Sequence, residues 1–177
     1  MKEHIIIAGA GGQGIMLLGK ILAETAMGEG KFVTWLPSYG AEVRGGTAHC
    51  MLVISDEEIG SPYVDKADTL IVMNEPSLVR FQSSLKRGGL LIVNSSLAKM
   101  NHALKGVKVH AQGFTDEAVE LGNIKVANMV ALGSFISCKG IIRKETALKV
   151  IKKNAPPGRQ DLIVVNSQAI ERGVVLR

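Results

Sequence analysis

The sequence predicts a single α/β domain in which an open, largely parallel and twisted sheet is covered by helices on both faces. Short β-branched and aliphatic runs, typical of buried parallel strands, alternate along the chain with longer segments whose apolar residues recur at helical spacing. A glycine-rich loop follows the first of these strands and precedes the first helix. One domain over residues 1–177 is expected, because domains commonly contain about 100–200 residues.

The first three elements predict a βαβ unit. His4 to Ala8 form a β-branched run that indicates a buried strand, and residues 15–28 carry apolar side chains at helical spacing. Residues 31–35 predict a second strand, so the connection should be a right-handed crossover. Residues 38–47 are polar and contain several glycines, which predicts a loop.

The remaining chain continues the alternation. Further strands are expected over residues 48–54, 68–74, 90–94 and 107–111. Pro76 suits the start of a helix that should end near Gly88 and Gly89, and Thr115 resembles the N-cap of another helix. Additional helices are expected over residues 128–139, 144–153 and 161–172, although Ile163 to Val165 would also suit a strand.

Glycine is over-represented in this chain and concentrated in two places. There are 20 glycines among 177 residues, above the usual share of about 7%, and several of them lie in residues 9–14 and 40–46. These two segments follow the first two predicted strands, so both should lie at one edge of a doubly wound sheet. The excess marks a surface where the backbone comes close to another group.

The first glycine segment matches G-x-G-x-x-G between a predicted strand and a predicted helix. Glycines there let the backbone turn tightly and approach a phosphate at the helix N-terminus. The second predicted strand ends without the acidic residue that a NAD site uses, and the absence of G-K-[ST] excludes a P-loop nucleotide-binding site. Ligand contact and simple close packing remain equally compatible with the pattern. The candidate binding residues are Gly9, Gly11, Gly12, Gln13 and Gly14.

The second glycine segment places a phenol, a carboxylate and a guanidinium among glycines. The Arg44 side chain presents a planar fork suited to phosphate or carboxylate, and Tyr39 could stack on a ligand or hydrogen-bond to it. A surface ion pair between Glu42 and Arg44 is the alternative, but such side chains on a loop after a strand favour a binding role. The candidate binding residues here are Tyr39, Glu42, Arg44, Gly45 and Gly46.

Composition narrows the range of partners and cofactors. The net charge is +5, with Lys and Arg spread along the chain and no interleaved aromatic residues, which argues against a nucleic-acid partner. Cys50 and Cys138 are the only cysteines and the four histidines lack metal-binding spacing, so no metal site is expected on this chain. No apolar run approaches the roughly 20 residues of a membrane span and no signal peptide is evident, so a cytoplasmic protein is expected.

Taken together, six stretches of the sequence resemble the gamma subunit of 2-oxoacid:ferredoxin oxidoreductases, most of all the 2-oxoglutarate and 2-oxoisovalerate types. The stretches are Gly9–Ile15, Thr34–Thr47, Gly60–Pro62, Met73–Ser77, Gly88–Asn94 and Asn128–Gly133. The resemblance runs from about Ile5 to Gly173 and implies a Rossmann-like fold. Enzymes of this family convert a 2-oxoacid, expected here to be 2-oxoglutarate, and coenzyme A to an acyl-CoA, carbon dioxide and reduced ferredoxin.

The resemblance also implies a division of labour among subunits. Thiamine diphosphate, magnesium and iron–sulfur clusters are expected on partner chains, namely the alpha and beta subunits and a ferredoxin-like delta subunit or domain, with ferredoxin as electron acceptor. This chain is expected to carry no catalytic residue, to be inactive alone, and to face coenzyme A or a partner. The candidate partner contacts are Met16, Trp35, Leu36 and Tyr39. Self-association of the isolated chain as a homodimer through such an apolar patch is a further expectation.

Two other functions fit parts of the sequence. A stand-alone Rossmann-like protein that binds a nucleotide or an anion would also use the glycine loop, although the acidic residue of a NAD site is missing. The beta-type subunit of an indolepyruvate oxidoreductase contains a related domain. Co-purification with a thiamine-binding chain would separate the subunit from the stand-alone protein.

Overall fold

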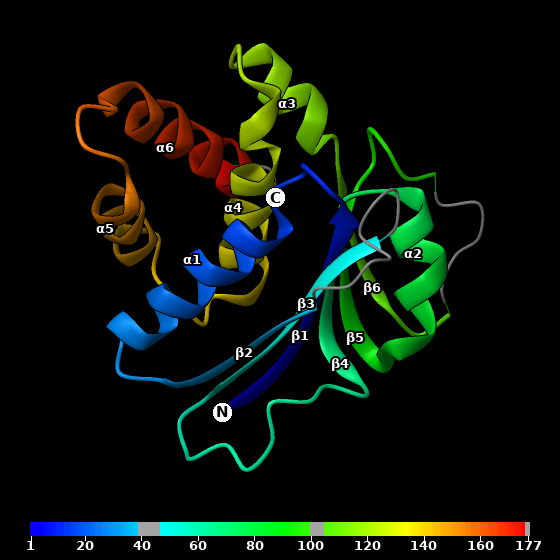
Figure 1. Cartoon of the computed structure of the whole chain (residues 1–177). Coiled ribbons are helices and arrows are strands. Elements are labelled where there is room, and N and C mark those ends of the chain that lie inside the picture. Colours follow the sequence, from blue (N-terminus) through cyan, green and yellow to red (C-terminus); the bar gives the residue numbers. More distant parts are fainter. Residues whose placement is uncertain (39–46, 100–104, 176–177) are drawn as a thin grey trace.

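The computed structural model describes residues 1–38, 47–99 and 105–175 of the chain. They form an α/β domain around a six-stranded sheet with the strand order β2-β3-β1-β4-β5-β6 (Figure 1). The strands are β1 (Lys2–Ala10), β2 (Phe32–Ser38), β3 (Thr47–Ser55), β4 (Ala67–Val72), β5 (Leu85–Asn94) and β6 (Lys108–Gln112). β1, β4, β5 and β6 pair in parallel, whereas β3 is antiparallel to both of its neighbours. The predicted α/β fold with a largely parallel sheet is confirmed.

Helices cover both faces of this sheet. They are α1 (Ile15–Gly28), α2 (Glu75–Phe81), α3 (Phe114–Glu120), α4 (Ala127–Lys139), α5 (Lys144–Asn154) and α6 (Gln160–Val175), with short 3₁₀ turns η2 (Gln82–Ser84) and η3 (Ile124–Val126). α1, α3, α4, α5 and α6 lie on one face, and α2 lies on the other (Figure 1). Within the described ranges, none of the helices combines the length and the apolar character needed to cross a bilayer.

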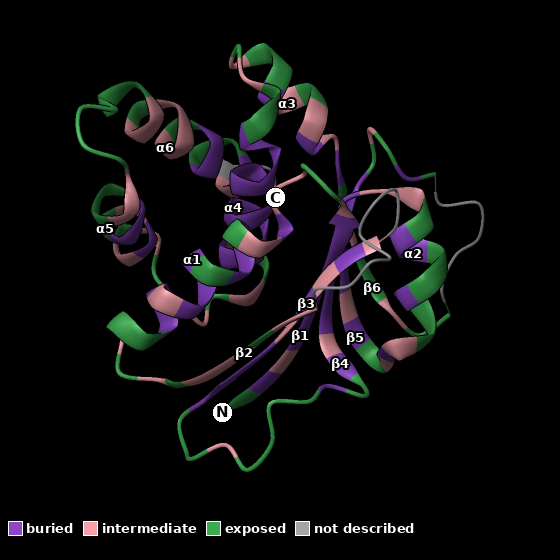
Figure 2. Cartoon of the chain, in the orientation of Figure 1, coloured by how far each residue is buried: buried purple, intermediate pink, exposed green. Residues whose placement is uncertain are grey.

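The sheet is buried on both faces, which explains its continuous apolar runs. In β1, Ile5 and Ile7 pack under the larger helical layer, while Ile6 and Ala8 pack on the side of α2. Successive residues of a strand point to opposite faces, so both sets must be apolar. α4 is the most buried helix, purple over most of its surface in Figure 2, because it lies between the sheet and the outer helices.

Two glycines allow α4 and α6 to cross in backbone contact. A Cβ atom on Gly133 of α4 would lie 2.9 Å from the Cα of Gly173 on α6 and would collide with the Ile170 carbonyl oxygen. Only glycine fits at such an approach. Part of the glycine excess therefore serves helix packing rather than a binding loop.

The predicted βαβ unit is present, because β3 is antiparallel to both β1 and β2 and these two strands therefore run in the same direction, but they are not neighbours. β3 lies between them, with Ala10 of β1 opposite Thr47 and Ser38 of β2 opposite His49. The eight residues 39–46 between β2 and β3 are too few for a parallel crossover, which needs a dozen or more, so β3 returns antiparallel to β2. The apolar runs predicted the strands, but their order depends on pairing across the sheet.

Two helix boundaries also differ from the prediction. The helix that begins near Pro76 ends at Phe81 rather than near Gly88 and Gly89, because those glycines already belong to β5. Thr115 is not an N-cap, since α3 begins at Phe114. The ambiguous segment over residues 161–172 is helical, as predicted, within α6.

Candidate functional site

The glycine loop lies at the carboxyl end of β1, where it turns directly into α1. Gly14 has a left-handed conformation (φ 71°) and forms the N-cap of the helix. The N–H groups of Gly11 and Gly12 make no hydrogen bond to any described residue. Free amides in a glycine loop that leads into a helix favour an anion or a carbonyl group from another molecule.

Gln13 holds the loop in shape from inside. Its Oε1 accepts a hydrogen bond from the Ala10 amide at 2.7 Å, and its Nε2 donates to the Met73 carbonyl oxygen at 3.2 Å. The Ala10 amide is therefore satisfied within the loop and is not available to a ligand. Gln13 therefore acts as a brace between the ends of β1 and β4.

Close packing accounts for Gly9 and Gly14. A Cβ on Gly9 would lie 2.6 Å from Ile15 Cδ1 and 2.9 Å from the Cβ of Met73, and a Cβ on Gly14 would collide with the side chain of Asn128. By contrast, a Cβ on Gly12 would meet nothing within 4 Å. Of the five candidate residues in this loop, the structure thus gives Gly9 and Gly14 a packing role and leaves Gly12 facing open space.

Polar side chains from three other elements converge on the same edge. Asn128 at the start of α4 is buried and donates through Nδ2 to the Gly14 carbonyl oxygen at 3.1 Å. Asn94, at the end of β5, donates to the Met73 carbonyl oxygen at 3.1 Å and to Thr115 Oγ1 at 2.9 Å. These bonds tie the ends of β1, β4 and β5 to the starts of α3 and α4.

A cavity of about 150 Å³ lies at this edge, beside the glycine loop. Its lining residues are Gly12, Gln13, Met73, Leu97, Thr115, Ile124, Lys125 and Ala127. Leu97 and Ile124 are exposed apolar side chains (46% and 59%), and Lys125 is the cation among the lining residues. The carboxyl edge of the parallel strands, where open α/β sheets bind ligands, therefore carries a small hollow with an apolar rim.

The second predicted glycine segment lies outside the described residues. Tyr39, Glu42, Arg44, Gly45 and Gly46 all fall within residues 39–46. The residues that flank this segment, Ser38 and Thr47, do lie at the same edge as the glycine loop, because Thr47 is opposite Ala10.

The candidate partner contacts on β2 and α1 divide into two groups. Trp35 packs against α1, with its Nε1 only 2.8 Å from where a Cβ of Gly19 would stand, and Met16 also packs on the core. Leu36 is 39% exposed on the edge strand β2. Leu36 is thus the contact candidate of this group that faces outward.

The two cysteines lie on different elements, Cys50 on β3 and Cys138 on α4. Cys50 is buried beneath α1, where burial raises its pKa to about 12, while Cys138 is exposed at the end of α4. No group of three His, Cys, Asp or Glu side chains among the described residues could hold a metal ion. A cluster held by four thiolates needs more cysteines than this chain has.

The fold and the carboxyl edge of the sheet together define the class of protein. It is a mixed, mostly parallel α/β domain in which Gln13 braces a glycine loop at that edge. Residues 4–176 match the family described as pyruvate ferredoxin/flavodoxin oxidoreductase, and the chain belongs to this family. The gamma subunit of a keto/oxoacid ferredoxin oxidoreductase from Geobacter sulfurreducens has a similar structure, with a TM-score of 0.83, 31% identity, and coverage of 97% of this chain and 96% of that one. The chain is therefore of the gamma type.

Other relatives differ in length. The 2-oxoglutarate synthase subunit KorC of Methanothermobacter marburgensis is 34% identical over 96% of this chain and 95% of its own length. The ketoisovalerate oxidoreductase subunit VorA of Methanothermobacter thermautotrophicus is 36% identical over 97% of this chain, but this chain spans only 36% of that protein. A 2-oxoglutarate:ferredoxin oxidoreductase from Magnetococcus marinus, with 2-oxoglutarate, coenzyme A and succinyl-CoA bound, shares the fold with a TM-score of 0.88 at 22% identity.

Several residues at this edge were not among the predicted site residues. Asn94, Thr115, Lys125 and Asn128 lie near the glycine loop only because the strands and helices converge there. One signal was available for Asn94, since a polar residue that directly follows a buried apolar run marks the end of a strand. Nothing in the sequence connects residue 128 to residue 14.

Proposed function

We propose that this chain is the gamma-type subunit of a multi-chain 2-oxoacid:ferredoxin oxidoreductase, with residues 1–177 forming one gamma-type domain. The observation that carries the proposal is the end-to-end similarity to KorC proteins, which reaches 34–36% identity over 96% of this chain and 93–95% of theirs. We infer that the complex oxidatively decarboxylates 2-oxoglutarate and transfers the acyl group to coenzyme A. The VorA match makes 2-oxoisovalerate the second candidate substrate.

The cofactors of the reaction belong, in this proposal, to partner chains. Thiamine diphosphate with magnesium is assigned to the alpha and beta subunits, and iron–sulfur clusters to these chains or to a ferredoxin-like delta subunit that passes electrons to ferredoxin. The cysteine count supports the assignment, because an iron–sulfur cluster is usually held by four thiolates and this chain has only Cys50 and Cys138. This chain then completes the assembly and carries no catalytic group.

The carboxyl edge of the sheet beside the glycine loop is the proposed contact with coenzyme A or with a partner chain. The amides of Gly11 and Gly12 are open to an acceptor, and Arg44 belongs to a segment whose flanking residues lie at this edge. A cavity of about 150 Å³ holds a phosphate-sized group rather than a whole coenzyme, whose class of ligand usually fills about 300–1,000 Å³. Only part of coenzyme A would therefore enter it.

Reconstitution tests the subunit assignment. The chain is co-expressed with the proposed thiamine-binding and ferredoxin-like partner chains, and the purified complex is assayed for coenzyme A-dependent reduction of ferredoxin. We expect a stable complex with a higher kcat/KM for 2-oxoglutarate than for 2-oxoisovalerate or pyruvate. A chain that purifies alone and binds NAD would refute the proposal. A higher kcat/KM for 2-oxoisovalerate would make that compound, rather than 2-oxoglutarate, the substrate.

A pair of glycine variants tests the coenzyme A contact. Gly12 and Gly158 both have positive φ (88° and 77°) and open space around a Cβ, so Asp at either position brings the same charge and similar backbone strain. In the reconstituted complex we expect Gly12→Asp and Arg44→Ala to raise the KM for coenzyme A, and Gly158→Asp to leave it unchanged. Normal assembly with an unchanged KM for coenzyme A in the first two variants would mean that the glycine loop and Arg44 do not contact coenzyme A.

A further inference from the structure

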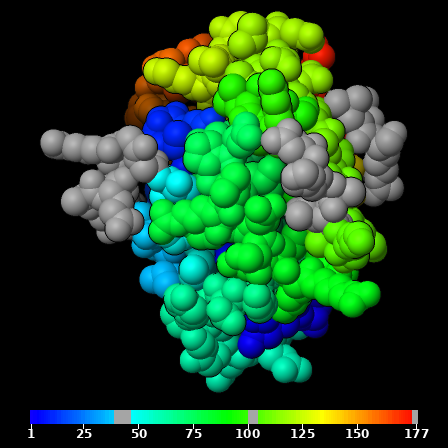
Figure 3. Space-filling model, turned by 90° about the vertical axis from the view of Figure 1, so that its right-hand side faces the viewer, coloured from blue at the N-terminus to red at the C-terminus, as the bar shows by residue number. Residues whose placement is uncertain are grey.

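A second hollow lies at the opposite end of the sheet from the glycine loop. It is a cavity of about 390 Å³ at the amino edge, where β1, β5 and β6 begin. In Figure 3 the blue N-terminal residues come to the surface beside green residues of the β5 region at the lower end of the molecule. The charged lining residues are Lys2, Glu3, Asp68, Lys86, Arg87, Lys108 and Lys139.

Two carboxylates inside this hollow hold two of its cations. Glu3 is buried, accepts a hydrogen bond from Thr69 Oγ1 at 2.6 Å, and pairs with Lys139 Nζ at 2.8 Å. Asp68 pairs with Lys86 Nζ at 2.7 Å. Partial burial raises the pKa of Asp68, but hydrogen bonds from Lys86 and His4 outweigh it and leave the pKa below its ordinary value, so the carboxylate is charged at neutral pH. Each carboxylate neutralises one ammonium group.

Three further cations have no such partner. Lys2, Arg87 and Lys108 form no ion pair with any described residue, and they come from three different strands. The five cations and two anions of the lining leave an excess of three positive charges. Like charges gathered around one concave surface repel each other and raise the local concentration of anions.

The shape of this hollow is built into β5. Between the pairs Ala67–Leu85 and Thr69–Leu90, β4 advances by two residues while β5 advances by five, so residues 86–89 leave the ladder. Gly88 has φ 80° and donates its N–H to the Gly106 carbonyl oxygen at 2.6 Å.

The neighbouring glycine is equally constrained. A Cβ on Gly89 would lie 2.8 Å from the Lys86 carbonyl oxygen and 3.0 Å from that of Asp68. The glycine pair therefore permits the excursion that presents Lys86 and Arg87 to the cavity.

We propose that this amino-edge hollow binds a small polyvalent anion of the phosphate ester or diphosphate class. Arg87 supplies a planar guanidinium suited to two phosphate oxygens, and Lys2 and Lys108 supply ammonium groups from the flanking strands. Lys86 and Lys139 are held in place by their carboxylates and complete the basic wall. The site is independent of the proposed coenzyme A contact, because it lies at the other edge of the sheet.

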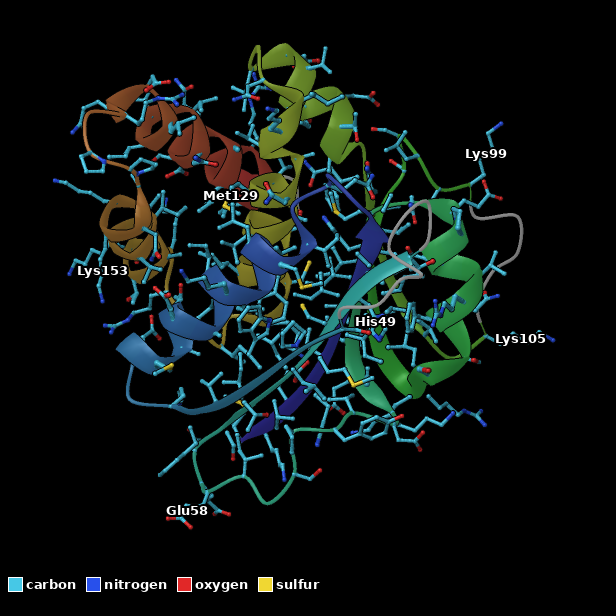
Figure 4. The ribbon with its side chains drawn as sticks, in the orientation of Figure 1. His49, Glu58, Lys99, Lys105, Met129 and Lys153 are labelled. Atoms are coloured by element: carbon cyan, nitrogen blue, oxygen red, sulfur yellow. The ribbon has the colours of Figure 1, made fainter. Side chains whose placement is uncertain are left out.

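Calorimetric titration of the 177-residue chain with inorganic pyrophosphate tests the proposal. The test variant is Arg87→Ala with Lys108→Ala, which removes two exposed cations of the hollow. The matched control is Lys149→Ala with Lys153→Ala, which removes the same charge from exposed positions of α5, the helix on which Figure 4 labels Lys153. Thermal unfolding of all three proteins establishes that each is folded.

The expected result is binding to the wild type that weakens as salt is added, a loss of affinity of at least about tenfold in the test variant, and wild-type affinity in the control. Equal weakening in both variants would mean general charge attraction and would overturn the proposal. So would the absence of pyrophosphate binding to the wild type. Binding of a poly-glutamate peptide without binding of pyrophosphate would also overturn the proposal, because the ligand of the hollow would then be an acidic protein surface and not a small anion.

Discussion

Replacing Gln13 by Glu tests the brace at the glycine loop, because the change exchanges the side-chain NH₂ group for an oxygen and keeps the size and shape of the side chain. The carboxylate still accepts from the Ala10 amide, now 2.7 Å from Oε1. At Nε2, however, an oxygen replaces the donor that lies 3.2 Å from the Met73 carbonyl oxygen, so attraction becomes repulsion. The Met73 oxygen keeps its bond from Asn94 Nδ2, and the damage is confined to one contact.

The magnitude follows from these contacts. The lost bond, with a carboxylate oxygen now facing the Met73 carbonyl oxygen, costs about 1–3 kcal/mol, and a negative charge near the N-terminus of α1 offsets about 0.3–1 kcal/mol of this cost. The free energy of unfolding should therefore fall by about 1–2 kcal/mol at pH 7. Because only the ionised form repels the carbonyl, the pKa of the new Glu should rise above its ordinary value of about 4.3 in the folded state. The destabilisation should then shrink as the pH falls towards 4.

Urea denaturation at pH 7 and at acidic pH measures the effect. Gln168→Glu, an exposed position on α6, is the control and should change stability by less than about 0.5 kcal/mol at either pH. Gln13→Ala should be destabilised at both pH values without the recovery on acidification, because it removes both bonds and adds no titratable group. A Gln13→Glu variant as stable as the wild type at pH 7, or one whose deficit does not depend on pH, would refute the brace.

Three further predictions concern the fold. Gly133→Ala should lower the free energy of unfolding by about 2 kcal/mol or more in urea denaturation, because its Cβ would meet the backbone of α6; Gly28→Ala, at an exposed helix end, should cost nothing. Folding lowers the pKa of Asp68, so its contribution to stability is present above its unfolded pKa of about 3.9 and is lost as the pH falls through the lower folded pKa. Asp68→Asn should therefore reduce Tm at pH 7, and the difference in Tm from the wild type should disappear below about pH 4. A maleimide should label only Cys138 in the native chain and both thiols after denaturation, as read by mass spectrometry, because Cys50 is buried with a pKa of about 12; native labelling of Cys50 would contradict the packing under α1.

Local signals were sufficient for much of the fold. The β-branched run from His4 to Ala8 predicted β1, and the glycine loop that follows it predicted the turn into α1. Both depend on residues within a few positions of each other, where period and backbone freedom decide the outcome. For the same reason the family resemblance, which depends on short contiguous motifs, could be stated from the sequence.

Boundaries and partners that depend on distant residues were missed. Thr115 looked like an N-cap because Asp116 and Glu117 follow it, yet its hydroxyl is taken by Asn94 from β5 and the helix starts one residue earlier. The helix from Pro76 ends earlier than predicted, because Gly88 and Gly89, which mark its predicted end, belong to the irregular start of β5.

The amino-acid sequence by itself determined the α/β class, the glycine loop at the end of β1 and the gamma-type family, since each depends on patterns of residues that are close together in the sequence. Only the tertiary structure decided that β3 lies between β1 and β2, that Asn128 closes on Gly14, and that cations from β1, β5 and β6 gather in one hollow. Those arrangements join residues separated by as many as 114 positions. They are set by pairing and packing energies that no local pattern carries.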